Sequence, residues 1–275
     1  MISTTNIGAL ASIYRYPVKS MMGEELSATR IGSKGLVGDR AFALADVATG
    51  KIASAKNPSK WPNLFAFRAS FTQPVADTTP LPPARITFPD GSTISTEDGS
   101  ISHRLSSVLG KPVKFLNNAS SPGTLEEYWP DIDGLARRDV VTDEAMPPET
   151  FFDVGIIHIV TTATLDSLRG AYPQGRFETR RFRPNLVIET APELKGYPEH
   201  GWLEKILSIG SEVKLKITGD CGRCVMTTLA QADLPKDTGI LKAAAKDNQA
   251  RVGIYASVLK GGTVRMGDAV HLESA

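Results

Sequence analysis

Cysteine is scarce in this chain, with two residues among 275, and two are too few for a disulfide framework. An excess of one charge is also lacking, because the formal net charge is +1. Bulk electrostatics therefore does not draw the chain to nucleic acid or to membranes. No run of about 18 apolar residues occurs, and residues 1–20 lack the pattern of a secretory signal. We expect a cytoplasmic protein with no nucleic-acid or membrane partner.

Short alternating segments bounded by glycine and proline are frequent, which is typical of strands. Helical spacing is confined to residues 101–109, ending at Gly110, to residues 163–169 behind a threonine N-cap, and to residues 240–250. The sequence therefore predicts a mainly β protein with a few helices. The segments predicted as strands are residues 13–16, 26–31, 41–45, 65–71, 85–88, 156–160, 186–189, 213–217, 251–258 and 267–272.

The length exceeds the usual ~100–200 residues of one domain. Residues 117–150 are polar and rich in proline, glycine and aspartate, so they are the best candidates for a boundary. We expect two domains, residues 1–120 and residues 121–275.

The two cysteines lie together in Cys221-Gly222-Arg223-Cys224. Such a pair can be a redox dithiol, half of a zinc site, a metal ligand with a bystander, or two inert buried thiols. Isolated histidines argue against zinc, and an iron–sulfur cluster usually needs four thiolates. A thioredoxin-type dithiol normally lies at the start of a helix, whereas residues 225–228 are expected to continue as strand or loop. Arg223 favours a thiolate, the form that ligates metals, but the spacing alone leaves the inert pair open.

Three short segments carry basic and small polar residues, and the first of them lies in a turn where a strand ends. They are Lys19-Ser20 after a tyrosine and a proline, Arg40 after Gly38, and residues 180–185 with three arginines and Asn185. Each segment alone fits a solvated surface. Together they offer the charges, forked guanidiniums and hydrogen-bond partners that a phosphorylated dianionic cofactor needs. His158, in an apolar strand, is interpreted as a core histidine rather than a ligand.

These residues, in this order, resemble the MOSC family, named after the C-terminal domain of molybdenum cofactor sulfurase. Residues 16–20 and 38–40 resemble its N-terminal β-barrel region, and residues 182–185, 221–228 and 237–239 resemble the MOSC domain proper. The pattern is most similar to the mitochondrial amidoxime-reducing component and its bacterial relatives. The resemblance implies a MOSC-type β-barrel in residues 121–275, an N-terminal β-barrel region in residues 1–120, and a molybdenum cofactor in the cleft between them.

The resemblance also implies roles for individual residues. Cys224 falls on the position of the catalytic cysteine that binds molybdenum, and Cys221 is not expected to be a ligand. Thr161 and Thr162 lie where a pterin-contacting loop is expected. The other positions that hold the pterin and its phosphate fall on Lys19, Ser20, Arg40, Arg183, Asn185, Gly222, Arg223 and Tyr255.

The activity implied by the resemblance is a molybdenum-dependent oxidoreductase that removes oxygen from small N-hydroxylated substrates. Electrons are expected from a separate donor protein of the flavin reductase, ferredoxin or cytochrome b5 type, since neither a ferredoxin-like domain nor a membrane anchor is recognised. The aminotransferase-like domain of cofactor sulfurases is not recognised either, so no pyridoxal phosphate is expected. Two alternatives stay open: a sulfur or cofactor carrier that bears a persulfide on Cys224, and a non-enzymatic binding module with structural cysteines.

Overall fold

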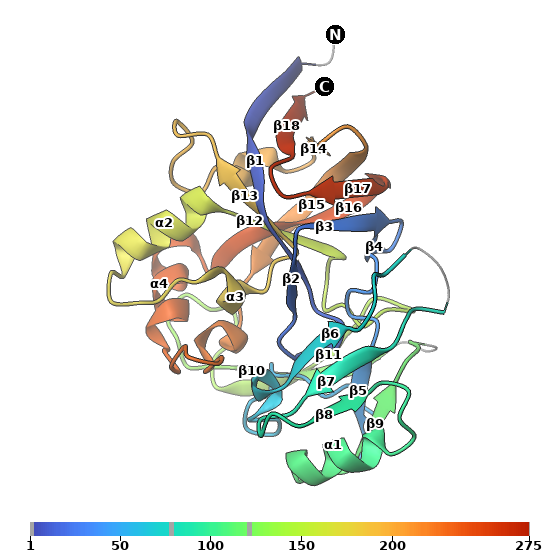
Figure 1. Cartoon of the computed structure of the whole chain (residues 1–275). Coiled ribbons are helices and arrows are strands. Elements are labelled where there is room, and N and C mark those ends of the chain that lie inside the picture. The colour runs from blue at the N-terminus through green and yellow to red at the C-terminus, as the bar shows by residue number, and fades with distance from the viewer. Residues whose placement is uncertain (1–2, 77–79, 120–122, 275) are drawn as a thin grey trace.

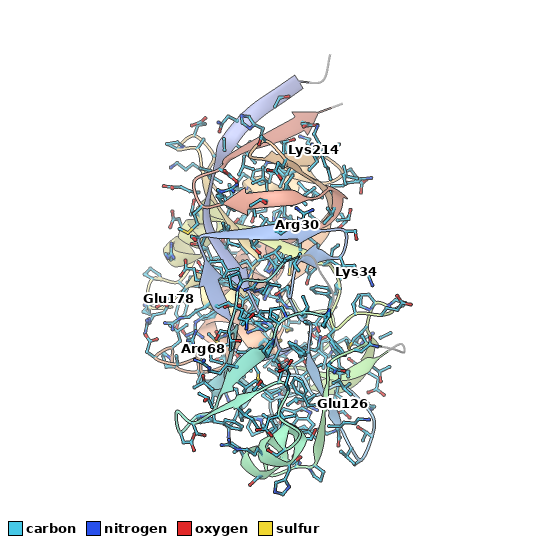
Figure 2. The ribbon with its side chains drawn as sticks, turned by 45° about the vertical axis from the view of Figure 1, so that its right-hand side comes forward. Arg30, Lys34, Arg68, Glu126, Glu178 and Lys214 are labelled. Carbon is cyan, nitrogen blue, oxygen red and sulfur yellow. The ribbon has the colours of Figure 1, made fainter. Side chains whose placement is uncertain are left out.

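The computed structural model describes residues 3–76, 80–119 and 123–274. A β-barrel forms one end of the molecule, and smaller sheets form the other (Figure 1). The protein is mainly β with a few helices, as predicted. Charged side chains of both signs extend from the barrel, at Lys214, to the smaller sheets, at Glu126 (Figure 2). Within the described residues, no helix has the length and apolarity needed to cross a membrane.

The barrel closes because its first strand pairs on both sides. Neighbouring strands follow the order β13-β12-β16-β15-β14-β18-β1, and β1 also pairs with β13. Only β12 and β13 run parallel among these barrel pairs. Closure leaves the barrel without a free edge, and alternate side chains fill its interior. The strands are β1 (Ser3–Arg15), β12 (Ile157–Thr161), β13 (Leu186–Thr190), β14 (Ile206–Ile209), β15 (Val213–Gly222), β16 (Arg251–Lys260) and β18 (Ala269–Ser274).

The two ends of the chain share sheets. Strand β1 belongs to the barrel that the C-terminal half builds, and β2 (Glu24–Leu26) extends it. Strand β3 (Ala28–Gly32) pairs with β4 (Gly35–Leu36) and with β17 (Gly262–Arg265). The turns that follow these N-terminal strands therefore lie next to the barrel that the C-terminal half builds.

The segment predicted as a polar boundary contains a hairpin. Strands β10 (Thr124–Trp129) and β11 (Val140–Ala145) pair antiparallel. A bridge from Ile52 to Leu125 joins them to the N-terminal half, where β5 (Ala43–Asp46) pairs with β9 (Val113–Leu116). The predicted boundary between residues 120 and 121 lies outside the described residues.

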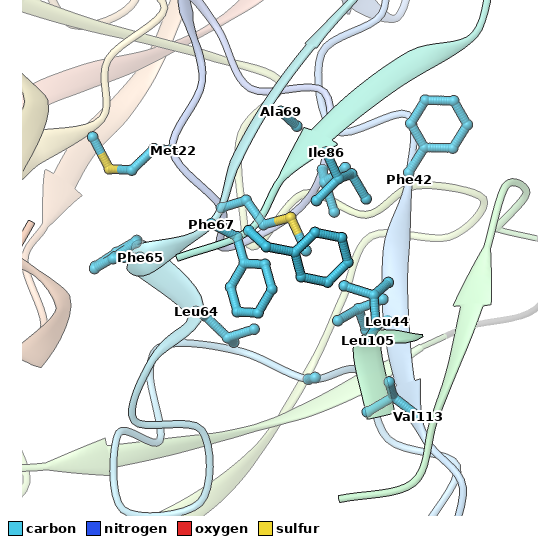
Figure 3. Packing of buried hydrophobic residues seen from close by; sticks show 14 of the residues in the cluster. Met22, Phe42, Leu44, Leu64, Phe65, Phe67, Ala69, Ile86, Leu105 and Val113 are labelled. Atoms are coloured by element: carbon cyan, nitrogen blue, oxygen red, sulfur yellow. The ribbon is translucent and has the colours of Figure 1, made fainter. Parts of the chain in front are cut away.

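An apolar cluster joins the β5–β9 pair to a three-stranded sheet and to the first helix. Strands β6 (Arg68–Phe71), β7 (Ala84–Thr87) and β8 (Thr93–Ser95) form one sheet, and α1 (Ile101–Leu109) ends at Gly110 as predicted. Phe67 lies among Leu64, Ile86 and Leu105 (Figure 3).

The strand predicted over residues 65–71 is wrong in its first half. Residues 64–66 form the 3-10 turn η1 (Leu64–Ala66), and only the residues of β6 form a paired strand. Leu64 and Phe65 are both buried although they are neighbours, whereas a strand directs neighbours to opposite faces.

Three helices cover one side of the barrel (Figure 1). They are α2 (Thr162–Ala171), α3 (Thr179–Phe182) and α4 (Gly239–Asn248). The predicted N-cap is present, because the Thr161 hydroxyl accepts from the backbone N–H of Thr164 at 3.2 Å. A 3-10 helix, η2 (Pro198–Trp202), follows β13. Residues 225–228 form a further 3-10 helix, η3 (Val225–Thr228), which corrects the expected strand or loop.

Candidate functional site

A cavity of about 80 Å³ lies where the barrel meets the smaller sheets. Its walls come from turns after β1, β4 and β5, from residues 151–155, from β12, from the residues before β13, from the end of β15, and from the middle of β16. That volume holds several water molecules or one small anionic group. The sequence-predicted residues at the cavity are Lys19, Ser20, Arg40, Arg183, Asn185, Gly222, Arg223, Cys224 and Tyr255.

Three of these residues hold unusual backbone angles. Ser20, Arg40 and Arg183 have φ values of 62°, 46° and 53°, a left-handed region that non-glycine residues rarely occupy. Strain of this kind costs about 1–3 kcal/mol per residue and persists only where surrounding structure enforces it. Its concentration at one cavity favours a binding role for these side chains.

Positive charge predominates at the cavity. Five cationic side chains line it, namely Lys19, Lys56, Arg40, Arg183 and Arg223, against one carboxylate, Asp153. The Nζ atom of Lys19 donates to the Phe151 carbonyl at 2.7 Å and forms an ion pair with Asp153. Burial lowers the pKa of Lys19. Burial and the neighbouring charge of Arg40 lower the pKa of Arg183 to about 10. An anion bound here would therefore relieve mutual repulsion.

Two charged residues at the cavity were missed by the sequence analysis. Lys56 contacts Glu127 at 2.9 Å and lies 3.8 Å from Asp153. Burial opposes the charge of Asp153, but Lys19 and Lys56 outweigh it and lower its pKa. Lys56 lies in a turn and Asp153 in a loop, and neither is part of a motif that the sequence analysis recognised. No local signal in the sequence could have identified them.

Asn185 connects the strand ends around the cavity. Its Nδ2 donates to Asp39 Oδ2 at 2.9 Å, and its Oδ1 accepts from the backbone N–H of His158 at 3.0 Å. Asp39 in turn forms an ion pair with Arg40. His158 is buried, as interpreted, with Nε2 3.2 Å from the Val252 carbonyl, yet it also lines the cavity.

The two cysteines occupy different environments. Cys221 is fully buried, and Arg223 Nη1 donates to its Sγ at 2.7 Å. Burial opposes ionisation, but Arg223 and His158 lower the pKa of Cys221 to about 6. Cys224 is partly exposed in the cavity wall, and burial raises its pKa to about 11 although Lys56 opposes this. Arg223 was expected to favour a thiolate, and it does so mainly at Cys221 rather than at Cys224.

Several predicted residues lie apart from the cavity. Thr161 Oγ1 donates to the buried Glu199 at 2.8 Å. The Thr162 hydroxyl accepts from the Thr190 N–H at 3.1 Å and lies 3.3 Å from the Thr190 hydroxyl. Arg180 forms ion pairs with acidic residues on the surface. Arg181 is fully buried and donates hydrogen bonds to backbone carbonyls. Of the three clustered arginines, the structure thus brings only Arg183 to the cavity.

Two sequence models match the chain. The MOSC N-terminal beta barrel domain matches residues 7–109, and the MOSC domain matches residues 150–271. The chain belongs to the MOSC family. Comparison with curated proteins gives no match.

Solved structures align with this MOSC protein at low identity. YuaD from Bacillus subtilis covers 100% of both chains with 14% identity and a TM-score of 0.50. YiiM from Geobacillus stearothermophilus aligns over 56% of this chain and 73% of its own, with 14% identity and a TM-score of 0.32. The likeness to YuaD concerns the fold alone.

The side chains at the cavity of this MOSC protein suit the phosphate and the metal of a molybdenum cofactor, the group with which the family is associated. The excess of cations fits a phosphate, and the buried Nε of Arg223 has no hydrogen-bond partner among the described residues. No cluster of three or more His, Cys, Asp or Glu side chains within the described residues could hold a metal. A metal here would thus depend on sulfur atoms of the cofactor, with Cys224 as the available thiol of the chain.

Alkylation with iodoacetamide should distinguish the two thiols in the folded protein. We expect modification of Cys224 alone, at a rate that rises about tenfold per pH unit between pH 7 and 10, because only the thiolate reacts and the pKa is about 11. Cys221 should stay unmodified because its side chain is inaccessible. Peptide mass spectrometry gives the measurement, and Cys224→Ser is the control. Rapid labelling of Cys221 at pH 7 would contradict the burial of its side chain.

Proposed function

We propose that the protein is a molybdenum-cofactor-dependent oxidoreductase that reduces N-hydroxylated or related N-oxygenated compounds. The observation that supports this most is one cavity lined by five cationic side chains and by the thiol of Cys224. A dianionic phosphate and a sulfur-ligated metal need that combination. For a hydroxylamine, the balanced reaction consumes two electrons and two protons, breaks the N–O bond, and releases the amine and water.

The residues of the chain would hold the cofactor at two places. Lys19, Arg40 and Arg183 would bind the phosphate, with Ser20 and Asn185 among its hydrogen-bonding neighbours. Cys224 would be the protein ligand of the metal. When bound, the cofactor supplies a centre that takes up an oxygen atom and exchanges two electrons.

Lys56 is a suitable donor for the oxygen atom of the substrate. Burial lowers its pKa, but the carboxylates of Asp153 and Glu127 outweigh burial and raise it. Its ammonium group therefore keeps its proton at neutral pH in the same cavity as Cys224. A charged donor in a partly dry site stabilises negative charge that develops on oxygen.

The electrons are proposed to come from a separate protein of the flavin reductase, ferredoxin or cytochrome b5 type. Two cysteines among 275 residues are too few for an iron–sulfur cluster within the chain. The partner would have to dock near the cavity, since electron transfer needs a short path.

Metal and pterin analysis tests this proposal. Protein made with molybdate in a host that produces molybdopterin should contain both in near-stoichiometric amounts and reduce amidoximes or hydroxylamines with an artificial donor. Arg183→Gln should lower the affinity for pterin about 10- to 100-fold, the effect of losing a hydrogen bond to a charged group. The exposed Arg85, changed to Gln, is the matched control and should have no effect.

Three results would count against the proposal. Folded protein with neither metal nor pterin, when a known molybdoenzyme from the same cells is loaded, would favour the binding module. Sulfur bound to Cys224 without molybdenum would favour the carrier. Equal pterin content in Arg183→Gln and Arg85→Gln would contradict the assignment of the cavity.

A further inference from the structure

A single aromatic ring contacts two arginines of the cavity. The guanidinium carbon of Arg40 lies 4.5 Å from the centroid of the Tyr16 ring, and that of Arg183 lies 4.2 Å from it. Tyr16 follows the last residue of β1 and is 2% exposed. The two arginines come from segments more than 140 residues apart, yet both line the cavity.

The other contacts of these arginines offset their repulsion only in part. Arg40 also lies 6.0 Å from the centroid of the Phe152 ring, and Arg183 lies 5.2 Å from that of Phe65. Arg40 forms an ion pair with Asp39, and its Nη2 lies 3.5 Å from the Arg183 carbonyl. Arg183 donates to the Met21 carbonyl at 2.8 Å, and no carboxylate forms an ion pair with it among the described residues. Two like charges so close need a further attraction to keep their places when no anion is bound.

The face of an aromatic ring supplies that attraction. Its negative quadrupole attracts guanidinium groups, and the attraction strengthens when water is excluded. The Tyr16 hydroxyl is buried and has no hydrogen-bond partner among the described residues. The ring rather than the hydroxyl therefore makes the useful contact.

We propose that Tyr16 is a positioning residue of the anion site: its ring holds the guanidiniums of Arg40 and Arg183 together at the cavity wall before the anion binds. This inference rests on the proposed function, since the anion is the phosphate of the cofactor. Preorganised cations bind an anion more tightly because the cost of ordering their side chains is already met.

The affinity for inorganic phosphate of protein made in a host without molybdopterin tests this role. Titration calorimetry at low ionic strength would compare wild type, Tyr16→Phe, and proteins in which mono-, di- or trifluorophenylalanine replaces Tyr16. Fluorine withdraws charge from the ring face while nearly preserving its shape. We expect Tyr16→Phe to bind within about twofold of wild type, and the affinity to fall stepwise with fluorination to about tenfold, which corresponds to about 1.4 kcal/mol. Tyr16→Leu should lose at least as much.

Thermal unfolding and two further variants separate the possible outcomes. A structural role alone would lower the melting temperature but leave the fluorination series flat, and a flat series overturns the inference. Loss of affinity in Tyr16→Phe would assign the effect to the hydroxyl and also overturn it. If Arg183→Gln weakens phosphate binding while the fluorination series is flat, only the role of Tyr16 fails. If Arg183→Gln and the control Arg85→Gln both bind phosphate as wild type does, the cavity is not the phosphate site. Both the role of Tyr16 and the anion site of the proposed function are then contradicted.

Discussion

Cys224→Ser is expected to lose molybdenum and all turnover of N-hydroxylated substrates, while the protein stays folded. Among the described residues, Cys224 is the cysteine whose side chain reaches the cavity. A serine hydroxyl is far less acidic than a thiol, so the variant does not supply the thiolate form of the side chain that ligates a metal. Pterin content should fall less than metal content, because the cations at the cavity are unchanged. Metal analysis, pterin fluorescence and activity with an artificial donor give the three measurements.

The neighbouring cysteine supplies a matched control for this change. Cys221→Ser alters the same chemical group three residues away, but in a fully buried position held by Arg223. We expect it to keep its metal and to lose activity about tenfold, the lower end of the effect of residues that orient a metal site indirectly. Loss of metal in Cys221→Ser with retention in Cys224→Ser would reverse the assignment of the two cysteines.

Local sequence could not determine which thiol Arg223 would contact. Arg223 lies one residue before Cys224 and two after Cys221, so either contact was open. The pairing of β15 with β16 decides it, because a register shift between Asp220 and Gly222 redirects the chain there. The resulting contact is with Cys221, at 2.7 Å. Motifs therefore identified the residues of the pair, but the sheet determined their environments.

In the rest of the site and in the fold, too, local sequence predicts some features and tertiary structure determines the others. Lys19, Arg40 and Arg183 could be predicted because each lies in a short motif of basic and small polar residues. Lys56 and Asp153 could not, since only tertiary packing brings them to the cavity. Periodicity likewise predicted most of the strands. It carries no information about their partners, so the closure of the barrel by β1 and β13 was not predictable.

Arg181→Met is expected to destabilise the protein by about 3–5 kcal/mol, because several carbonyls lose their donor and each unsatisfied buried group costs about 1–3 kcal/mol. Arg181 is fully buried. Its guanidinium donates to carbonyls of Thr227 and Leu229, both at 3.2 Å, and of Pro235 and Arg176, both at 2.9 Å. Methionine fills a similar volume but donates nothing, so these carbonyls lose their partner. Urea unfolding of the variant and of wild type measures the difference.

The adjacent arginine tests whether this effect depends on burial. Arg180 makes ion pairs with Glu178 and Asp233, and both acidic side chains are more than one-third exposed. Exposed pairs contribute about 0–1 kcal/mol, so Arg180→Met should change the free energy of unfolding by no more than about 1 kcal/mol. Because Arg181 fixes the segment directly after Cys224, Arg181→Met should also lose molybdenum at temperatures where Arg180→Met retains it. Equal unfolding midpoints for the two variants would show that Arg181 does not anchor the segment that follows Cys224.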